Sequence, residues 1–459
     1  MKKLLLKDVI KITQAKVIQG SNNMIVDDIV TRCKGIKQGT LLFDRYKRND
    51  IFELSQPLNF SYAVITDRPS RFNEAFDNAT IIEVNDVEDA YWRFVEYYRD
   101  LFNIPVIGIT GTCGKTTTKE IIRHILSQKL NVTATYKSYN AQIHHLSYLL
   151  DINDETQAAV IEMGVAYPDD LKIACKFFKP QIGVITNIGI DHLNAFGSQE
   201  EYIKGKAKFI EGLGYKGTLI INADDENIKT IDFGKFRGNL IKFGFDKSSQ
   251  FKITHVKQHE TGLDFVLQND GASYHFFVPG YGEFVVKNAV AAIAAAYAAG
   301  FKVKEAGEAL RNFHNVERHF EIKKGINGSS VIDDTWSTNP TSAAEALKVL
   351  INLSKGKKSI AVLSKMSLLG KQSTYYHNKI GKEAAKMGVD ELIIIGEDAQ
   401  DIGLGALSSG MTPEHVHTCV DSKEVLVLLY KMMDKESITL IKTTMLASYK
   451  DIVDKVTIK

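Results

Sequence analysis

The stretch from residue 105 to 126, PVIGITGTCGKTTTKEIIRHIL, constrains the fold of this chain more than any other feature. A short β-branched run is followed by a loop of glycine and threonine, and then by a helical pattern with its apolar residues on one face. A strand, a glycine loop, a Lys-Thr pair and a helix in this order are typical of a phosphate-binding loop. The strict pattern has a small residue five positions before the Gly-Lys pair, where this chain has Ile109.

The loop predicts a site for nucleotide phosphates. Its backbone N–H groups can face a phosphate, the Lys115 side chain supplies positive charge, and the Thr116 hydroxyl is a ligand for Mg²⁺. The expected ATP contacts are Gly111, Thr112, Cys113, Gly114, Lys115, Thr116 and Thr117. Cys113 lies at a helix N-terminus, which favours a thiolate, so a redox-sensitive loop is one hypothesis and a small tolerated residue is the other. The alternative for the whole loop is a glycine-rich turn without a ligand.

Short apolar runs alternate with helical patterns from residue 105 onward, which predicts a mainly parallel sheet with helices on both faces. Residues 251–279 alternate polar and apolar residues and predict antiparallel strands, and an alanine-rich helix is expected over 288–299. We therefore expect an α/β chain of three domains. They are a small mixed α/β N-terminal domain (residues 1–103), a central P-loop ATPase-like doubly wound sheet (104–315) and a C-terminal Rossmann-like domain (316–459).

Composition narrows the classes of function. The 459 residues carry a formal net charge of +2, which gives no electrostatic case for nucleic acid or a membrane surface. The apolar run near the N-terminus is too short for a signal peptide, and no run approaches the length of a membrane span. The four cysteines are scattered and lack metal-ligand spacing. We expect a soluble, cytoplasmic protein with neither nucleic-acid nor membrane partners.

Polar residues follow several of the predicted strands. Because ligands of an open parallel sheet bind beyond the carboxyl ends of its strands, Glu162, Asn187 and His192 should lie at the same edge as Lys115. A carboxylate there suits a metal that bridges ATP phosphates. A loop-capping glutamate and a structural histidine are the simpler alternatives for these residues taken alone.

Further charged residues are ambiguous from spacing. Lys204, Lys206 and Lys208 are most simply a solvated helix face. Arg318 could neutralise phosphate charge, and Asp334 ends a strand where a ribose or a metal could be held. Both also have ordinary salt-bridge interpretations.

Several motifs in order resemble the Mur ligase family of ATP-dependent enzymes that form amide bonds. Its phosphate loop is similar to TGTCGKTT at residues 110–117, and the family tolerates an apolar residue at the position of Ile109. The further matching stretches, in chain order, are IEMG, TNIGIDHL, FGSQEEYIKGKAKF, NADDEN, KNAVAAIAAA, ERHFEI and DDTWSTNPTSAAEAL. The C-terminal stretches resemble the branch that joins D-alanyl-D-alanine to UDP-N-acetylmuramoyl-tripeptide.

The resemblance implies roles for individual residues. Thr116 and Glu162 would hold one Mg²⁺, while His192 and a carbamylated Lys206 would hold a second. Lys115 would act on the phosphates, with Arg318 reaching them from the C-terminal domain. The other implied contacts are adenine for Asn288, ribose for Asp334, and the γ-phosphate and acceptor for Asn140. The implied enzyme is a monomer that uses ATP, two Mg²⁺ ions and two small-molecule substrates, a carboxylate acceptor and an amine donor.

The chain also departs from that branch. Ala141 and His144 stand where the branch has an asparagine and a glycine. The remaining departures are Phe284-Val285 for His-Asn, Trp336-Ser337 for Tyr-Asn, KTTM at 442–445 for Lys-Gly-Ser-Arg, TRC at 31–33 for Asp-Ser-Arg, and GTLLFDRY at 39–46 for a GDLFVAL-like run. The ATP machinery is kept and the substrate surfaces differ. This leaves two alternatives open, a ligase for a non-muramoyl carboxylate and a non-catalytic nucleotide-binding regulator.

Overall fold

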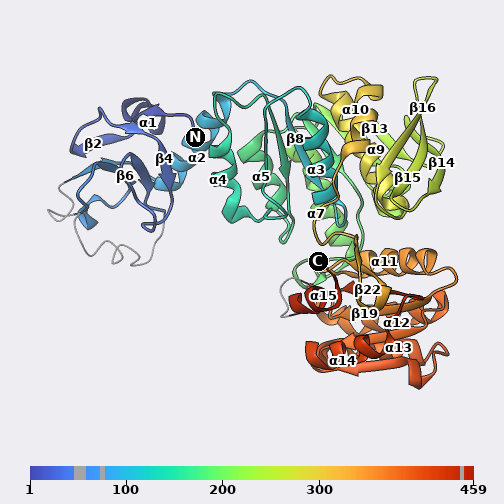
Figure 1. Ribbon diagram of the computed structural model, residues 1–459. Helices are drawn as coiled ribbons and strands as arrows, with labels where there is room; N and C mark the ends of the chain where they lie inside the picture. Colours follow the sequence, from blue (N-terminus) through green and yellow to red (C-terminus); the bar gives the residue numbers. More distant parts are fainter. Residues whose placement is uncertain (46–57, 73–77, 445–448, 459) are drawn as a thin grey trace.

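The computed structural model describes residues 1–45, 58–72, 78–444 and 449–458. Figure 1 shows three parts in chain order: an N-terminal part at one end, a central part, and a C-terminal part packed below the central one. Each part is built around its own larger sheet. None of the helices within the described ranges is long and apolar enough to cross a membrane.

In its described residues, the N-terminal part is a mixed sheet with two α-helices. Its five strands lie in the order β2-β7-β6-β5-β4, with only β2 antiparallel to its neighbour. The bounds are β2 (Lys16–Gln19), β4 (Asp28–Val30), β5 (Thr40–Phe43), β6 (Tyr62–Thr66) and β7 (Ala79–Glu83), with α1 (Leu6–Thr13), α2 (Val87–Asp100) and the small pair β1 (Leu4–Leu5) and β3 (Ile25–Val26). The predicted substrate motif ending at Tyr46 runs beyond the described residues at that position.

The central part is a nine-stranded sheet in the order β16-β15-β14-β13-β12-β11-β8-β10-β9. The strands from β14 back to β9 are parallel, and β15 and β16 continue the sheet as an antiparallel extension, as the alternation predicted. The bounds are β8 (Val106–Thr110), β9 (Val132–Ala134), β10 (Ala158–Glu162), β11 (Ile182–Ile185), β12 (Thr218–Asn222), β13 (Asn239–Gly244), β14 (Phe251–Gln258), β15 (Gly262–Asn269) and β16 (Ala272–Pro279).

Helices cover both faces of this sheet, which confirms the doubly wound prediction. One core joins α3 (Lys115–Leu126) and the alanine-rich α9 (Glu283–Ala298) to the sheet. A second core joins α5 (Asp170–Phe178) and α7 (Gln199–Gly212) to the opposite face and continues into the N-terminal part. The shorter helices here are α4 (His145–Asp151), α6 (Leu193–Phe196), α8 (Glu226–Lys229) and α10 (Val303–Ala309).

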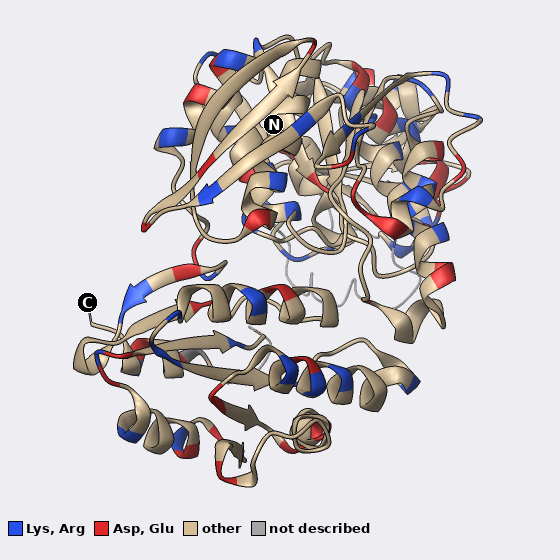
Figure 2. Cartoon of the chain, turned by 90° about the vertical axis from the view of Figure 1, so that its right-hand side faces the viewer, with Lys and Arg blue, Asp and Glu red and all other residues tan. Residues whose placement is uncertain are grey.

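The C-terminal part is a six-stranded sheet in the order β17-β18-β22-β19-β20-β21, parallel except for β17 at its edge. The bounds are β17 (Glu321–Lys324), β18 (Ser330–Asp333), β19 (Lys358–Ser364), β20 (Glu391–Ile395), β21 (Val416–Cys419) and β22 (Ser437–Lys442), with α11 (Pro340–Leu353), α12 (Ser373–Met387), α13 (Gln400–Leu407), α14 (Ser422–Met432) and α15 (Lys450–Val456). Figure 2 shows basic and acidic residues interspersed over the elements of the central and C-terminal parts.

Two predicted elements are shorter than the sequence indicated. The helical pattern of residues 116–130 predicts a helix that reaches Leu130, but α3 ends at Leu126, because Gln128 and Lys129 donate to carbonyls three residues back and tighten the chain there. The run IGVITNIG at residues 182–189 predicts a strand that ends near Asn187, but β11 ends at Ile185, because Thr186 and Asn187 turn to contact the phosphate loop.

Candidate active site

The phosphate loop leaves β8 and opens α3, and its two key glycines have no room for a side chain. Gly111 has φ +149°, and a Cβ there would lie 2.0 Å from Thr186 Oγ1. Gly114 has φ +78°, and a Cβ there would lie 2.4 Å from Asn288 Oδ1. Glycine adopts these φ values without steric cost. The loop is therefore closely surrounded on both sides.

The peptide of Cys113 is held by two residues that follow β11. Asn187 accepts from Cys113 N at 2.9 Å through its Oδ1 and donates to Cys113 O at 3.0 Å through its Nδ2. Thr186 Oγ1 donates to the same carbonyl at 2.7 Å. The sequence placed Asn187 at this edge and did not reveal that it braces the loop, because this contact joins segments 74 residues apart.

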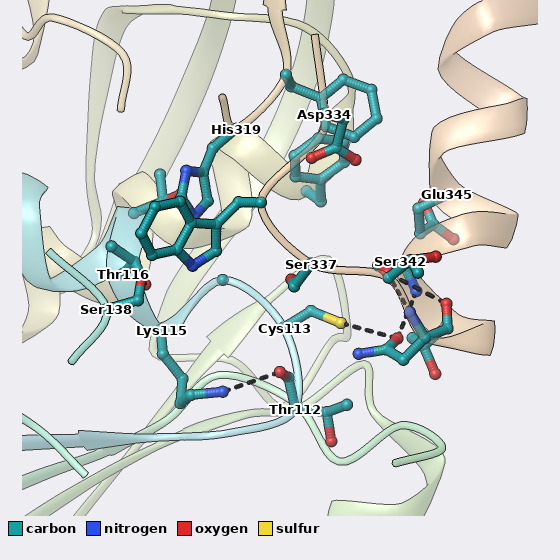
Figure 3. A pocket seen from close by; sticks show the side chains of 18 of the residues that line it. Thr112, Cys113, Lys115, Thr116, Ser138, His319, Asp334, Ser337, Ser342 and Glu345 are labelled. Carbon is teal, nitrogen blue, oxygen red and sulfur yellow. Dashed lines mark hydrogen bonds between the residues drawn. The ribbon is translucent and has the colours of Figure 1, made fainter. Parts of the chain in front are cut away.

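The loop borders a cavity of about 370 Å³ between the central and C-terminal parts. Among its lining residues, those predicted from the sequence are Thr112, Cys113, Gly114, Lys115, Thr116, Thr117, Asn140, Glu162, Asn187, His192, Asn288 and Asp334. Figure 3 shows the loop residues facing Ser337, Ser342 and Glu345 of the C-terminal part. The Lys115 Nζ donates to Thr112 O at 3.0 Å, so the ammonium folds back over its own loop.

A buried carboxylate lies beside the loop. Glu162 is 1% exposed; its Oε1 accepts from Asn140 Nδ2 at 2.6 Å, and its Oε2 has no hydrogen-bond partner. The Thr116 hydroxyl lies 2.7 Å from Ser138 Oγ. The cavity thus holds an unsatisfied carboxylate oxygen and a hydroxyl, which are ligand types that Mg²⁺ accepts.

Lys206 is buried beneath the loop, which contradicts the prediction of a solvated face. It is 1% exposed, and its Nζ donates to Gly111 O at 2.9 Å and to Thr110 Oγ1 at 3.3 Å. In a helix, positions two apart point to nearly opposite sides, so Lys206 faces the core while Lys204 stays in solvent with Glu200 and Glu201. Burial lowers the pKa of Lys206 well below its usual value, and the positive charge of Lys115 is the second cause of this shift.

His192 lines the cavity and stacks on Tyr202, with ring centroids 6.3 Å apart. Burial is the main cause that lowers the pKa of His192. The negative charge of Asp191 raises this pKa, and the positive charges of Lys206 and Lys115 lower it further. The ring is therefore neutral near pH 7, the form in which a histidine binds a metal.

Cys113 is not the thiolate that its position suggested. Burial raises the pKa of its thiol to about 11, and this outweighs the opposing effect of Lys115. The thiol instead contacts Asn339 Oδ1 at 3.6 Å, across the cleft.

The charged residues predicted in the C-terminal part lie in different places. Asp334 lines the main cavity and forms a 2.7 Å ion pair with the buried Lys442. Arg318 lines a second, adjoining cavity of about 270 Å³, which it shares with Thr116 and the stacked pair of His319 and Trp336. The predicted motif at 442–445 is described up to residue 444, and Met445 lies outside the described residues.

The cleft is bridged by direct hydrogen bonds. Ile190 N donates to Thr341 Oγ1 at 2.9 Å, and Asn339 Nδ2 donates to Asp191 Oδ2 at 3.3 Å. Asn194 N donates to Leu368 O at 3.0 Å. The same Asn339 caps α11 through a reciprocal pair of bonds with Ser342. The first helix of the C-terminal part therefore begins at the wall of the cavity.

Comparison with known families agrees with this arrangement. The Mur ligase middle domain matches residues 109–296, and the Mur ligase glutamate ligase domain matches residues 318–444. Together they cover more than half of the chain. The chain belongs to the Mur ligase family. It is an ATP-dependent ligase that forms an amide bond and releases ADP.

Two relatives of this Mur ligase carry the same name. The UDP-N-acetylmuramoyl-tripeptide–D-alanyl-D-alanine ligase of Bacillus subtilis is 28% identical over 368 residues, which are 80% of this chain and 79% of that protein. The enzyme of the same name from Synechocystis is 28% identical over 76% of this chain and 74% of that protein.

Solved structures share the fold of this Mur ligase. A crystal structure of MurF from Acinetobacter baumannii has a TM-score of 0.87 at 22% identity and 99% coverage of both chains. The MurF ligase of Thermotoga maritima, in complex with ADP, has a TM-score of 0.78 at 21% identity, covering 93% of this chain and 96% of that one. A pseudomurein peptide ligase of Methanothermus fervidus has a TM-score of 0.63 at 22% identity and 86% coverage of both chains.

Sequence reasoning missed several residues of the cleft. Within the described ranges, no group of three or more His, Cys, Asp and Glu side chains is arranged to hold a metal ion, so the predicted ligand sets depend on Thr116 and Lys206. The lining residues to which the sequence assigned no role are Ser138, Asp191, His319, Asn339 and Thr341, whereas Trp336 and Lys442 were named only within altered substrate motifs. A loop position after a strand end was the available signal for Ser138 and Asp191, whereas Lys442 ends a buried strand without a periodic signal.

Proposed function

We propose that this ligase joins D-alanyl-D-alanine to the carboxylate of UDP-N-acetylmuramoyl-tripeptide, a step in making peptidoglycan precursors. The observation that carries the proposal is the shared name of its relatives, two of which match along more than three quarters of both chains. The cavity supports it, because one space is lined by the phosphate loop, Glu162 and the C-terminal part. A monomeric state and a cytoplasmic location stay predictions.

The three sheets support the proposed division of labour. Residues 1–103 would bind the nucleotide-sugar substrate, residues 104–315 would bind ATP, and residues 316–459 would complete the site from across the cleft. The five-stranded sheet lies before residue 84, the nine-stranded sheet within 106–279 and the six-stranded sheet within 321–442.

The proposed reaction has two steps. The acceptor carboxylate attacks the γ-phosphorus of ATP, and the bond from this phosphorus to the β,γ-bridging oxygen breaks. The products of this step are ADP and an acyl phosphate. The amine then attacks the acyl carbon, phosphate leaves, and the nitrogen loses a proton. The first step brings two anions together, so its main requirement is charge neutralisation. Lys115 would swing from Thr112 O to the phosphates, and Arg318 would approach from the adjoining cavity.

The remaining nucleotide contacts are proposed in the same way. Asn288, whose amide lies against Gly114, would contact adenine, and Asp334 would contact the ribose beside its partner Lys442. Asn140 would orient the acceptor near the γ-phosphate, because its amide already lies on Glu162.

The residues present fit one Mg²⁺ ion well. Glu162 Oε2 is a buried oxygen without a hydrogen-bond partner, and Thr116 adds a hydroxyl that lines the same cavity. Bound there, Mg²⁺ would neutralise phosphate charge. The second predicted set, His192 and Lys206, fits a cation only if Lys206 carries a carbamate, because an ammonium has no lone pair to offer. A carbamate requires a neutral amine, and the burial of Lys206 favours that form.

A phosphate-release assay tests the proposal. ATP is supplied with UDP-N-acetylmuramoyl-tripeptide and D-alanyl-D-alanine together, and with each alone. We expect ADP and phosphate only when both substrates are present. Two results would overturn the muramoyl assignment. One is phosphate release that requires neither substrate, and the other is the absence of phosphate release from a protein that still binds ATP.

A second candidate is a ligase that activates a non-muramoyl carboxylate. The structural similarity to a pseudomurein peptide ligase favours it, as do Phe284 and Trp336 on the cavity wall, where the resemblance led us to expect more polar residues. Turnover on a panel of nucleotide-linked peptides other than the muramoyl tripeptide would select this candidate.

A further inference from the structure

Lys119 is a fully buried lysine one turn beyond the phosphate loop. Its side chain is 0% exposed. The Nζ donates to Thr135 O at 2.7 Å and to Lys137 O at 2.6 Å, and it pairs with Glu120 Oε1 at 2.6 Å. Burying an ammonium is costly unless it is paired and hydrogen-bonded, so a lysine at this position needs an explanation. None of the roles derived above uses it.

The carbonyls that Lys119 holds belong to the loop that follows β9. Lys137 has φ +47°, a left-handed conformation that residues with a side chain rarely adopt. The ammonium bonds to the carbonyl of this residue and to that of Thr135. Lys119 therefore fixes the backbone where the loop makes its least favourable turn.

The same short loop touches both proposed magnesium ligands. Ser138 Oγ lies 2.7 Å from Thr116 Oγ1, and Figure 3 shows these two residues side by side. Asn140 Nδ2 donates to Glu162 Oε1 at 2.6 Å, and Glu162 N donates to Thr135 Oγ1 at 3.1 Å.

We propose that Lys119 is a positioning residue for the ligase reaction: it fixes residues 135–140, and through Ser138 and Asn140 it sets the places of Thr116, Glu162 and the acceptor carboxylate. Thr116 and Lys119 are three residues apart on α3, so they project from the same face of the helix. The helix that begins at the phosphate loop thus also fixes the loop that follows β9. The kinetic consequence rests on the proposed function, whereas the structural consequence does not.

Lys119→Met tests the proposal, because methionine keeps most of the apolar stem and removes all three donors. The first readout is hydrogen exchange of the peptide spanning 134–141, measured without substrate. We expect the amides of Tyr139 and Asn140 to exchange roughly tenfold faster, with β8 and β10 unchanged. Lys129→Met is the matched control, since Lys129 is an exposed lysine just after α3 that pairs with Glu305.

The second readout separates binding from chemistry. We expect kcat/KM for the acceptor to fall by roughly tenfold to a hundredfold, because small displacements of positioning groups have effects of this size. Metal-free ADP binding should change less than twofold. Glu120→Gln keeps an oxygen acceptor for the ammonium and both carbonyl bonds, so it should lower stability while keeping the wild-type exchange of residues 134–141 and the wild-type kcat/KM.

If Lys119→Met does not fold, Lys119→Gln takes its place, because its shorter amide can still reach one carbonyl. Unchanged exchange in residues 134–141 of a folded variant overturns the proposal, and so does a loss of ADP affinity that parallels the loss of turnover. Wild-type inactivity toward the muramoyl substrate would refute the proposed function alone, because the exchange readout needs no substrate.

Discussion

Lys206 and Gly111 are joined by a 2.9 Å hydrogen bond from the lysine Nζ to the glycine carbonyl, so a buried amine supports the phosphate loop from below. The amine forms no ion pair with the described residues, and its other contacts are Thr110 Oγ1 and the ring of Tyr202. A lysine in such surroundings gains little from staying charged. This relationship is the physical basis for the proposed carbamate.

The carbamate has a direct spectroscopic test. We expect wild-type protein equilibrated with ¹³C-bicarbonate to give a carbamate carbonyl signal that is missing from Lys206→Gln. Turnover of the variant should fall by roughly a hundredfold or more, because an anionic metal ligand is lost. Lys204→Gln, which changes a solvent-exposed lysine of the same helix, should keep both the signal and the activity. A signal that persists in Lys206→Gln would place the carbamate elsewhere.

Glu162→Gln should separate nucleotide binding from catalysis. The change keeps the volume and the contact with Asn140, while the carboxylate that could hold Mg²⁺ becomes neutral. We expect a loss of turnover of roughly a hundredfold and a higher magnesium requirement, with metal-free ADP binding retained. Titration of turnover against magnesium checks this. An unchanged magnesium dependence would remove Glu162 from the metal site.

Thr341→Val should weaken the bridge across the cleft. The hydroxyl accepts the Ile190 amide, and valine has the same shape without an acceptor. A lost hydrogen bond of this kind is worth about 1 kcal/mol, so we expect nucleotide affinity in the closed state to fall about fivefold. Calorimetry with ADP measures it. Thr230→Val, an exposed threonine whose hydroxyl bonds within its own turn, is the control and should leave affinity unchanged.

His145 should make the stability of the protein depend on pH. It lies between the rings of Phe177 and Phe178, and burial lowers its pKa from 6.5 to about 4. In the unfolded chain His145 binds a proton below pH 6.5, whereas in the folded chain it does so only below about pH 4. The free energy of unfolding therefore falls as the pH falls from 6.5 to about 4. The upper limit of the effect is about 3 kcal/mol.

Urea unfolding at pH 7 and pH 5 measures this dependence. We expect His145→Phe to be less sensitive to acid than the wild type. His275→Gln, which changes an exposed histidine of β16, should keep the wild-type dependence. Equal acid sensitivity of His145→Phe and the wild type would show that other groups control it.

Cys113 should react slowly with alkylating agents. With a pKa raised to about 11, its thiolate fraction near pH 7.5 is roughly a hundredfold below that of an unperturbed thiol. Mass spectrometry after iodoacetamide treatment, compared with a free peptide of residues 108–120, checks the rate. Labelling as fast as in the peptide would restore the redox hypothesis.

The features of the fold and of the site that depend on a local pattern of residues could be predicted from the sequence. The strand, loop and helix around Lys115, the antiparallel extension after residue 251 and the shared edge of Glu162 and His192 follow from periodicity, glycine and strand order. The buried state of Lys206 could be recovered only from the resemblance, because a run of alternating lysines does not state which of them faces the core.

Other features depend on distant partners and have no local signal. The brace that Asn187 forms on Cys113 and the pair between Asp334 and Lys442 each join segments far apart in the chain. The raised pKa of the Cys113 thiol also had no local signal, because burial outweighed the local effect of the helix N-terminus.

Asn339 completes the first turn of α11 and at the same time contacts Cys113 and Asp191. A helix end and a phosphate loop therefore share one side chain. Coupling between two such sites is reciprocal: whatever ATP gains from an ordered α11, α11 gains from bound ATP. Bound nucleotide would therefore stabilise the start of α11, and the stability of the C-terminal part should rise with the concentration of ATP.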